Sequence, residues 1–310
     1  MFLGIDTSNY TTSAALYDSD NNSAVNFKKP LPVKSGEKGL RQSDAVFHHT
    51  VNLPEVLTEA LNTCRSISAV GVSVRPRDAE GSYMPCFRSG YAVAAAVGAA
   101  LGVPVFEFSH QAGHIAAALY SAGKLSLIGS KFIAFHFSGG TTEAVLVTPD
   151  EKNVFKCEIV AQSLDLKAGQ AIDRCGVMLG LNFPAGAELD RLAQKSEKRF
   201  NLKPVLKDGN PCLSGVENQC EKMFKSSENT CDIARFVIEY IGETARLMTD
   251  YLTDKYGKLP IIYAGGVMSN SIISAKLCDG KSRFFAEPQF SSDNAAGVSV
   301  LAAYKLGVIR

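Results

Sequence analysis

The sequence predicts an α/β protein built from two similar lobes, and three observations support this prediction. Apolar runs of strand length alternate along the chain with longer amphipathic segments of helix length, a pattern typical of α/β architecture. A segment near the start of the chain is repeated in similar form at an offset of 130 residues. The 310 residues also suffice for two cores of about 150 residues each.

The internal repeat aligns the segment that starts at Phe2 with the segment that starts at Phe132. Each copy is typical of a strand, a turn rich in hydroxyls and small residues, and a second strand. Such turns present N–H and hydroxyl groups that suit phosphate, so two copies suggest a nucleotide held between two lobes. Either turn alone would be an ordinary hairpin. The identical pairs are Phe2/Phe132, Ser8/Ser138, Thr11/Thr141, Thr12/Thr142, Ala14/Ala144 and Leu16/Leu146.

The remaining elements follow from hydrophobic spacing and from the positions of glycine and proline. In the first lobe we expect a Lys-rich loop at 28–41, a helix at 44–65, a strand at 69–74, a buried helix at 91–101 and a strand at 103–108. In the second we expect a helix at 168–181, a polar surface loop at 197–212, a long helix at 233–256, a strand at 260–264, a helix opened by Gly265-Gly266 and an apolar helix at 294–306. The lobes are placed at 1–129 and 130–310, with the last helix packing back toward the first lobe.

Composition excludes several classes of protein. The formal net charge is +1, so any contact with nucleic acid must use a local basic patch. The eight cysteines form no C-x-x-C pair, which favours reduced thiols over a disulfide framework. No secretory signal is visible and the most apolar window, 90–106, is too short to span a bilayer. We therefore expect a cytoplasmic protein without membrane contact. The best basic candidates are Lys28, Lys29, Lys34, Lys38, Arg41, Arg75 and Arg77.

A pair of histidines marks the strongest candidate site. His110 and His114 are two of only five histidines and directly follow a predicted strand. Helical spacing of i and i+4 places both imidazoles on one face, within reach of one metal ion. A zinc protease of the H-E-x-x-H type needs a glutamate as general base at position 111, and this chain has Gln111 there. The sequence therefore lacks the general base of that class of protease. A third ligand must come from elsewhere in the chain, and two packing histidines remain the alternative.

Two further features are weaker when taken alone. Gly265-Gly266 lies between a strand and a predicted helix, as in many nucleotide sites, but a turn that needs small residues explains it equally well. Asp293 directly precedes the last helix and could cap its N-terminus or supply the missing carboxylate ligand.

The order of these motifs resembles the TsaD/Gcp family, which attaches threonylcarbamoyl to adenosine in tRNA. The resemblance covers nearly the whole chain and implies the duplicated actin/Hsp70/sugar-kinase-like (ASKHA, RNase H-like) fold, with a nucleotide and metal cleft between its lobes. The matching motifs are Gly4–Ser8, His110 with His114, Phe137–Gly140, Ala171–Arg174, Leu179–Gly186, Leu213–Gly215, Gly265–Val267 with Asn270, and Ser292–Ala296.

This resemblance also implies roles for individual residues. His110, His114 and Asp293 would bind one divalent metal, Fe²⁺ or Zn²⁺, and Asp6 and Ser8 would be catalytic. Threonylcarbamoyl-AMP, or another adenine nucleotide, would be bound by His136, Phe137, Ser138, Gly139, Gly140, Asp173, Gly186 and Asn270. The activity would be an acyltransferase that passes threonylcarbamoyl to N6 of adenosine 37 in tRNA, with TsaB-like and TsaE-like partner proteins.

The sequence departs from the family pattern at four places. Tyr10 and Thr11 replace an acidic pair, Thr141 replaces a histidine, and Arg75–Gly81 replaces a Gly-Pro-Gly-Leu loop. A Val-Val-Pro-Glu segment has no clear counterpart around Gly39–His48. All four positions are near the acceptor or substrate side in the family. A paralogous carbamoyl- or acyl-adenylate transferase with another acceptor, and a non-catalytic scaffold of the same fold, are therefore the alternative hypotheses.

Overall fold

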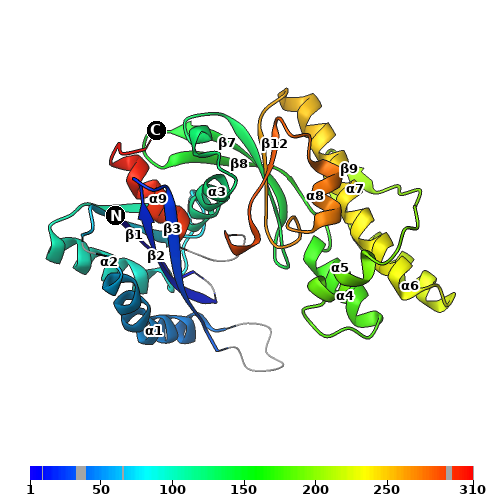
Figure 1. Cartoon of the computed structure of the whole chain (residues 1–310), viewed down its shortest axis with the longest axis horizontal. Coiled ribbons are helices and arrows are strands. Elements are labelled where there is room, and N and C mark those ends of the chain that lie inside the picture. Colours follow the sequence, from blue (N-terminus) through cyan, green and yellow to red (C-terminus); the bar gives the residue numbers. More distant parts are fainter. Residues whose placement is uncertain (9, 33–39, 65, 291–294, 310) are drawn as a thin grey trace. The chain divides into compact units, whose positions relative to one another are not determined.

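A computed structural model describes residues 1–8, 10–32, 40–64, 66–290 and 295–309. The chain divides into two compact units (Figure 1). Unit 1 comprises residues 1–130, 148–156 and 289–310, and unit 2 comprises residues 131–147 and 157–288. Unit 1 therefore contains the C-terminal segment and a hairpin tip from the middle of the chain in addition to the first 130 residues. Among the described residues, no helix is long and apolar enough to span a membrane.

Each unit is built on a five-stranded sheet, and the two sheets have the same strand order. The first sheet has the order β3-β2-β1-β4-β5, formed by Ser23–Pro30, Thr11–Asp18, Phe2–Asp6, Ala69–Arg75 and Val105–Ser109. The second has the order β8-β7-β6-β11-β12, formed by Val154–Gln162, Thr142–Asp150, Phe132–Phe137, Ile261–Ala264 and Arg283–Phe285.

The two opening hairpins also share their register. Phe2 pairs with Tyr17 and Phe132 pairs with Val147, so both strands of the second hairpin repeat the first at the offset found in the sequence. In each sheet the opening strand is antiparallel to its hairpin partner and parallel to the strand on its other side. The predicted duplication is confirmed by this shared topology.

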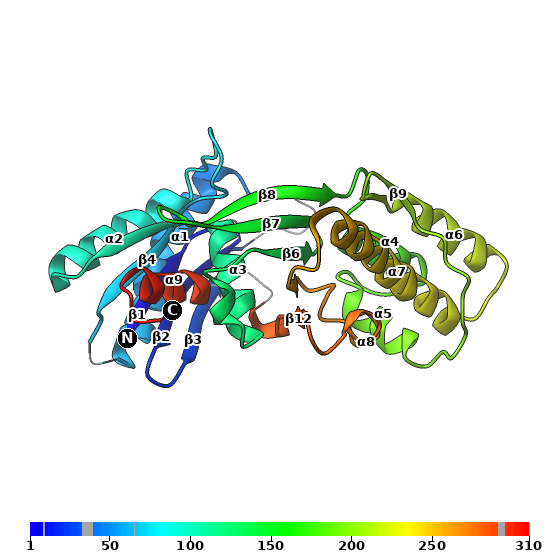
Figure 2. The ribbon, with the colours of Figure 1, turned by 90° about the horizontal axis from the view of Figure 1, so that it is seen from above.

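Helices cover both faces of the sheet in unit 1. Leu3 and Ile5 of β1 pack in the core formed with helices α1 (Gln42–Asn62) and α2 (Phe87–Leu101). Because side chains alternate along a strand, the intervening Gly4 faces the opposite side, which is covered by the C-terminal helix α9 (Ala296–Lys305). Helix α3 (His110–Ser121) packs beside α9 (Figure 2). The short helical turn η1 (Leu125–Leu127) belongs to the same unit, and η2 (Pro288–Phe290) begins at the last residue of unit 2.

The approach of α9 to its neighbours is close enough to require glycine. A Cβ atom on Gly297 would lie 1.7 Å from the carbonyl oxygen of Gly113 in α3, and one on Gly71 of β4 would lie 2.0 Å from the carbonyl oxygen of Val298. Backbone therefore touches backbone on two sides of α9. This contact explains why a helix that is apolar on nearly all sides belongs to unit 1.

Unit 2 is organised around the long helix α7 (Thr230–Tyr256), whose apolar face forms much of the core. Its other helices are α4 (Ala168–Met178), α5 (Gly186–Ala193), α6 (Ser214–Lys225) and α8 (Ser271–Leu277), and strands β9 (Val205–Lys207) and β10 (Asn210–Cys212) form a small hairpin. Residues 197–204 form neither helix nor strand, as predicted, and the hairpin corrects the prediction of an irregular loop over residues 205–212.

The helix predicted to start at Gly265-Gly266 was also placed wrongly. Helix α8 begins at Ser271, and Asn270 caps it by accepting hydrogen bonds from the backbone N–H groups of Ile272 and Ile273 at 3.0 and 3.1 Å. Gly265 has φ +95°, and a Cβ there would lie 2.2 Å from the carbonyl oxygen of Phe137. The glycines therefore form a tight turn against β6, and the helix starts where a capping side chain is available.

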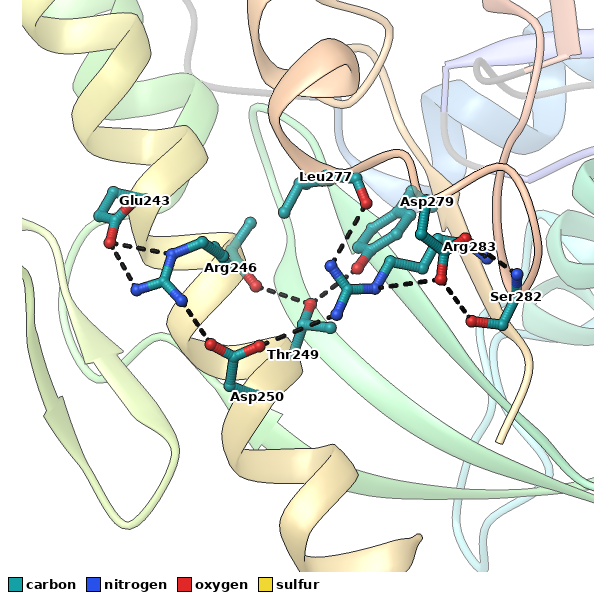
Figure 3. A network of polar contacts seen from close by, with 10 residues as sticks. Glu243, Arg246, Thr249, Asp250, Leu277, Asp279, Ser282 and Arg283 are labelled. Atoms are coloured by element: carbon teal, nitrogen blue, oxygen red, sulfur yellow. Dashed lines mark hydrogen bonds and ion pairs between the residues drawn. The ribbon is translucent and has the colours of Figure 1, made fainter. Parts of the chain in front are cut away.

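A polar network attaches α8 and β12 to α7 (Figure 3). Arg246 of α7 forms ion pairs with Glu243 at 2.7 Å and with Asp250 at 2.5 Å. Arg283 of β12 reaches Asp250 at 3.8 Å and donates to the carbonyl oxygen of Leu277 at 3.4 Å. Exposed ion pairs each contribute little to stability, but the carboxylate of Asp250 is shared by Arg246 and Arg283 and so links the edge strand β12 to α7.

Candidate functional site

The predicted histidines lie at the carboxyl edge of the first sheet. Strands β1, β4 and β5 are parallel, so their carboxyl ends meet at one edge, where Asp6 and the start of α3 also lie. Ser109 caps α3 by accepting a hydrogen bond from the backbone N–H of Ala112 at 3.2 Å, and His110 opens the helix. The ring centroids of His110 and His114 lie 4.3 Å apart, as expected for two side chains on one face of a helix.

Asp6 is the residue that orients His110. Its side chain is only 1% exposed, and its carboxylate contacts His110 Nδ1 at 2.8 Å, Ser73 Oγ at 2.6 Å and the Ser8 backbone N–H at 2.8 Å. Burial would raise the pKa of the Asp6 carboxyl, but the charge of His110 and hydrogen bonds from His110, Ser73 and Ser8 hold that pKa below its ordinary value. An ionised carboxylate can only accept a hydrogen bond, so Nδ1 of His110 is the donor in the contact with Asp6.

This arrangement fits a metal site. A carboxylate behind a histidine that fixes its tautomer and orientation is the usual support of a metal-binding imidazole, and His114 supplies a second imidazole on the same face. Within the described ranges no group of three His, Cys, Asp or Glu side chains is arranged to hold a metal. The predicted third ligand, Asp293, lies outside the described residues.

The two residues predicted to be catalytic have different environments. Asp6 is occupied by His110, Ser73 and Ser8, which favours a positioning role for its carboxylate. The Ser8 hydroxyl is buried, and among the described residues its oxygen has no hydrogen-bond partner. Ser73 was not predicted. It lies 67 positions from Asp6 in the sequence, and only the pairing of β1 with β4 brings the two together.

The loop that departs from the family pattern is attached to the start of α3. Asp78 accepts a hydrogen bond from Ser109 Oγ at 2.6 Å and forms an ion pair with Arg75 at 2.6 Å. Arg75 also donates to Asn153 Oδ1 at 3.1 Å, within the hairpin tip that belongs to unit 1. The Gln111 backbone N–H donates to the carbonyl oxygen of Pro76 at 3.0 Å. This loop therefore has a defined conformation beside the histidine pair.

Unit 2 contains a cavity of about 460 Å³ that brings together most of the residues predicted to bind nucleotide. The predicted residues that line it are Ser138, Gly139, Asp173, Gly186 and Asn270. Four further lining residues belong to the motifs identified in the sequence: Ile172, Pro184, Gly266 and Val267. Residues outside those motifs complete the lining: Gly169, Ala187, Asp190, Ile238 and Ser269. A volume of this size is in the range of small-molecule and cofactor pockets.

The Ser138-Gly139 turn forms one wall of this cavity. Ser138 Oγ accepts a hydrogen bond from the Thr141 backbone N–H at 3.1 Å, and the Ser138 carbonyl oxygen accepts one from Gly169 N–H at 3.1 Å. The second bond places the turn against the N-terminus of α4, where the helix dipole favours an anion. No atom lies within 4 Å of a Cβ built on Gly139, so a ligand can approach the backbone there.

Acidic and amide side chains form the other polar part of the lining. Asp173 Oδ1 accepts a hydrogen bond from the Ala185 backbone N–H at 2.8 Å, and no described residue contacts its Oδ2 through a hydrogen bond. Asn270 donates to Asp190 Oδ1 at 2.7 Å while it caps α8. Asn270 therefore shapes the cavity and positions Asp190. Because Asp190 follows Gly186 by one helical turn of α5, helical spacing from Gly186 could have pointed to it.

Three of the predicted nucleotide-binding residues are not in this lining. The Phe137 ring is fully buried in the core of unit 2, and its carbonyl oxygen accepts a hydrogen bond from Val267 N–H at 3.1 Å. His136 is half-buried on β6, opposite Glu143 of β7 and Ala264 of β11. Gly140 belongs to the same turn as Gly139 but does not line the cavity.

Two of the seven basic residues predicted to contact tRNA form ion pairs with described residues of unit 1. Lys29 forms an ion pair with Glu55 of α1, and Arg75 pairs with Asp78. Lys34 and Lys38 lie outside the described residues.

Two units with the same strand order, each opened by the same hairpin, define the ASKHA class of α/β proteins. Three solved structures align with the chain at 11–13% identity, which shows the fold alone. HypF from T. kodakarensis has a TM-score of 0.61 at 11% identity over 99% of this chain and 47% of its own, so the chain spans about half of HypF. Component A of (R)-2-hydroxyglutaryl-CoA dehydratase from Acidaminococcus fermentans has a TM-score of 0.55 at 12% identity over 99% and 98% of the two chains. The ROK hexokinase from Thermus thermophilus has a TM-score of 0.52 at 13% identity over 98% and 99%.

The chain belongs to the TsaD family. The family model for TsaD, tRNA N6-adenosine threonylcarbamoyltransferase, matches residues 34–300. At the level of the family, this match identifies a transferase of tRNA processing that forms threonylcarbamoyladenosine.

Proposed function

We propose that the chain transfers threonylcarbamoyl from threonylcarbamoyl-AMP to N6 of adenosine 37 in tRNA. The reaction would take place in the cytoplasm with TsaB-like and TsaE-like partners and one Fe²⁺ or Zn²⁺ ion. The observation that carries the proposal is the cavity of unit 2, where Ser138, Gly139 and Asp173 meet in a space that suits a nucleotide. Unit 1 contributes the pair of imidazoles supported by Asp6.

The reaction is an acyl transfer. The N6 amine attacks the carbamoyl carbon, the bond from that carbon to the phosphate oxygen breaks, AMP leaves, and the amine loses one proton. A metal held by His110, His114 and Asp293 would act as a Lewis acid that stabilises the developing negative charge. The protein's own contribution is to hold the phosphate at the Ser138-Gly139 turn, where backbone N–H groups and the α4 dipole oppose its charge. The Asp173 carboxylate would accept hydrogen bonds from the ribose hydroxyls.

Replacing Asp173 with alanine should weaken AMP binding by about 1–3 kcal/mol, the range for losing hydrogen bonds to a charged group. Calorimetry with AMP measures this change. Asp254→Ala is the matched control, because Asp254 is an exposed carboxylate near the end of α7 and does not line the cavity. Asp173→Asn separates binding from folding, since its amide oxygen can still accept from Ala185 N–H. AMP affinity that is equal in the wild type and both Asp173 variants would contradict the assignment.

The acceptor is tested by the nucleosides of cellular tRNA. If the proposal is right, deleting the gene lowers threonylcarbamoyladenosine, measured by mass spectrometry of digested tRNA, and the wild-type gene restores it. The replaced loop that Asp78 and Arg75 hold beside α3 specifically favours the alternative of a paralogous transferase with another acceptor. Unchanged threonylcarbamoyladenosine, together with intact AMP binding by the purified protein, would support that alternative.

A further inference from the structure

A second basic segment lies in unit 2, outside the cavity. Residues 195–207 contain five lysines and arginines and one acidic residue, in a chain whose net charge is only +1. Such a run is often a solvated loop with no binding role. Two structural observations, the anchoring of the segment and its unpaired cations, indicate a different role here.

The segment is anchored by its apolar residues. Phe200, Leu202 and Leu206 pack against the core of unit 2, and the Phe200 ring lies 5.4 Å from the ring of Phe236 in α7. The lysines and arginines of the segment are exposed: Lys195, Lys198, Arg199, Lys203 and Lys207. Packing of the apolar residues therefore holds the backbone, so that less conformational entropy is lost when the charged groups bind a ligand.

Phe200 lines two hollows. The first has a volume of about 750 Å³ and contains Arg199 with Arg235 of α7 and Lys276 of α8. The second has a volume of about 560 Å³ and contains Lys198 and Lys203. The segment therefore presents cations to two adjacent hollows.

Some of these cations are neutralised by acidic neighbours, and others are not. Lys198 pairs with Glu228 at 2.7 Å, Arg235 with Glu239 at 2.6 Å, and Lys276 with Glu243 at 2.7 Å. Lys195, Arg199 and Lys203 have no ion pair with any described residue, and Glu197 is the acidic residue within the segment. The surface therefore carries an excess positive charge along the segment.

We propose that this surface, with Lys195, Arg199 and Lys203 as its principal cations, binds the phosphate backbone of tRNA. The inference rests on the proposed function, which supplies tRNA as the acceptor. A single small anion would need only one hollow. Here the cations are spread along a fixed segment and over two hollows, and this arrangement matches a polymer that carries repeated phosphates. Contacts of this kind carry no sequence information and position the RNA.

The test is the salt dependence of binding to an unmodified tRNA transcript, measured with the full-length protein. Each phosphate contact contributes about 0.7–0.9 to the slope of log affinity against log salt. The triple variant Lys195→Gln/Arg199→Gln/Lys203→Gln should reduce the slope by about 2 and weaken binding at low salt at least about tenfold. Its affinity for AMP should stay at the wild-type value, because none of the three residues lines the nucleotide cavity.

The matched control is the triple variant Lys255→Gln/Lys258→Gln/Lys281→Gln, which removes the same charge from exposed positions of the same unit. Lys255 lies roughly 28 Å along α7 from Phe236, and this control should keep the wild-type slope. The inference would be overturned if the wild-type protein binds tRNA and the variant with Lys195, Arg199 and Lys203 replaced shows the same slope of log affinity against log salt. The inference would also be overturned if the salt dependence is lost only when a different set of residues, Lys28, Lys29, Lys34 and Lys38, is neutralised. If the wild-type protein binds no tRNA at low salt with its partner proteins present, the proposed acceptor fails and this inference fails with it.

Discussion

Replacing His114 with alanine is expected to prevent binding of the proposed divalent metal and to abolish measurable transfer. The substitution deletes one of the two imidazoles on the face of α3 but leaves the contact between Asp6 and His110 Nδ1 in place. Metal affinity should fall by more than the roughly 10- to 100-fold that is typical of losing a residue that only orients a ligand. Metal content measured by mass spectrometry should drop from about one equivalent to near zero.

Substitutions of Asp6 and His110 distinguish a residue that binds the metal from a residue that only orients a ligand. Asp6→Asn should weaken metal binding by about 10- to 100-fold without removing a ligand. His110→Ala should remove the metal and also leave the buried Asp6 carboxylate without the hydrogen bond from His110 Nδ1. His48→Ala is the control, because His48 lies on α1 beside Phe47 and outside this site. Metal content that survives both His110→Ala and His114→Ala would refute the site.

The second large effect is expected on stability. Gly297→Ala should lower the free energy of unfolding by at least about 3 kcal/mol, the upper part of the range for overpacking, because the new Cβ would lie 1.7 Å from the carbonyl oxygen of Gly113. Helix propensity alone predicts that the substitution raises the free energy of unfolding, because alanine is about 1 kcal/mol more favourable than glycine inside a helix. Urea unfolding followed by circular dichroism measures the difference.

Gly129→Ala is the control for this comparison. A Cβ on Gly129 would lie 3.9 Å from the Tyr304 hydroxyl, an ordinary contact distance, so its stability should stay within about 0.5 kcal/mol of the wild type. Equal unfolding midpoints for Gly297→Ala and the wild type would show that α9 and α3 are not packed backbone to backbone.

Several elements could be predicted from the sequence because their signals are local. Helix α7 and strand β4 lie within three residues of their predicted bounds, since hydrophobic spacing depends only on neighbouring residues. The duplicated hairpin was found in the same way, because residues that alternate in two similar strands align without knowledge of the sheet. The motif Phe137–Gly140, with Asp173 and Gly186, likewise identified part of a cavity lining.

The tertiary structure alone decided what these residues contact. Ser73 reaches Asp6, and Asn270 reaches Asp190, across 67 and 80 positions of the chain, so no local pattern could reveal either contact. The start of α8 was placed at Gly265-Gly266 instead of Ser271 for the same reason. Whether a glycine opens a helix or turns against a strand depends on what lies beside it, here the carbonyl oxygen of Phe137. Local spacing thus determined the elements and the types of chemical group available, and the packing of distant strands determined which groups meet.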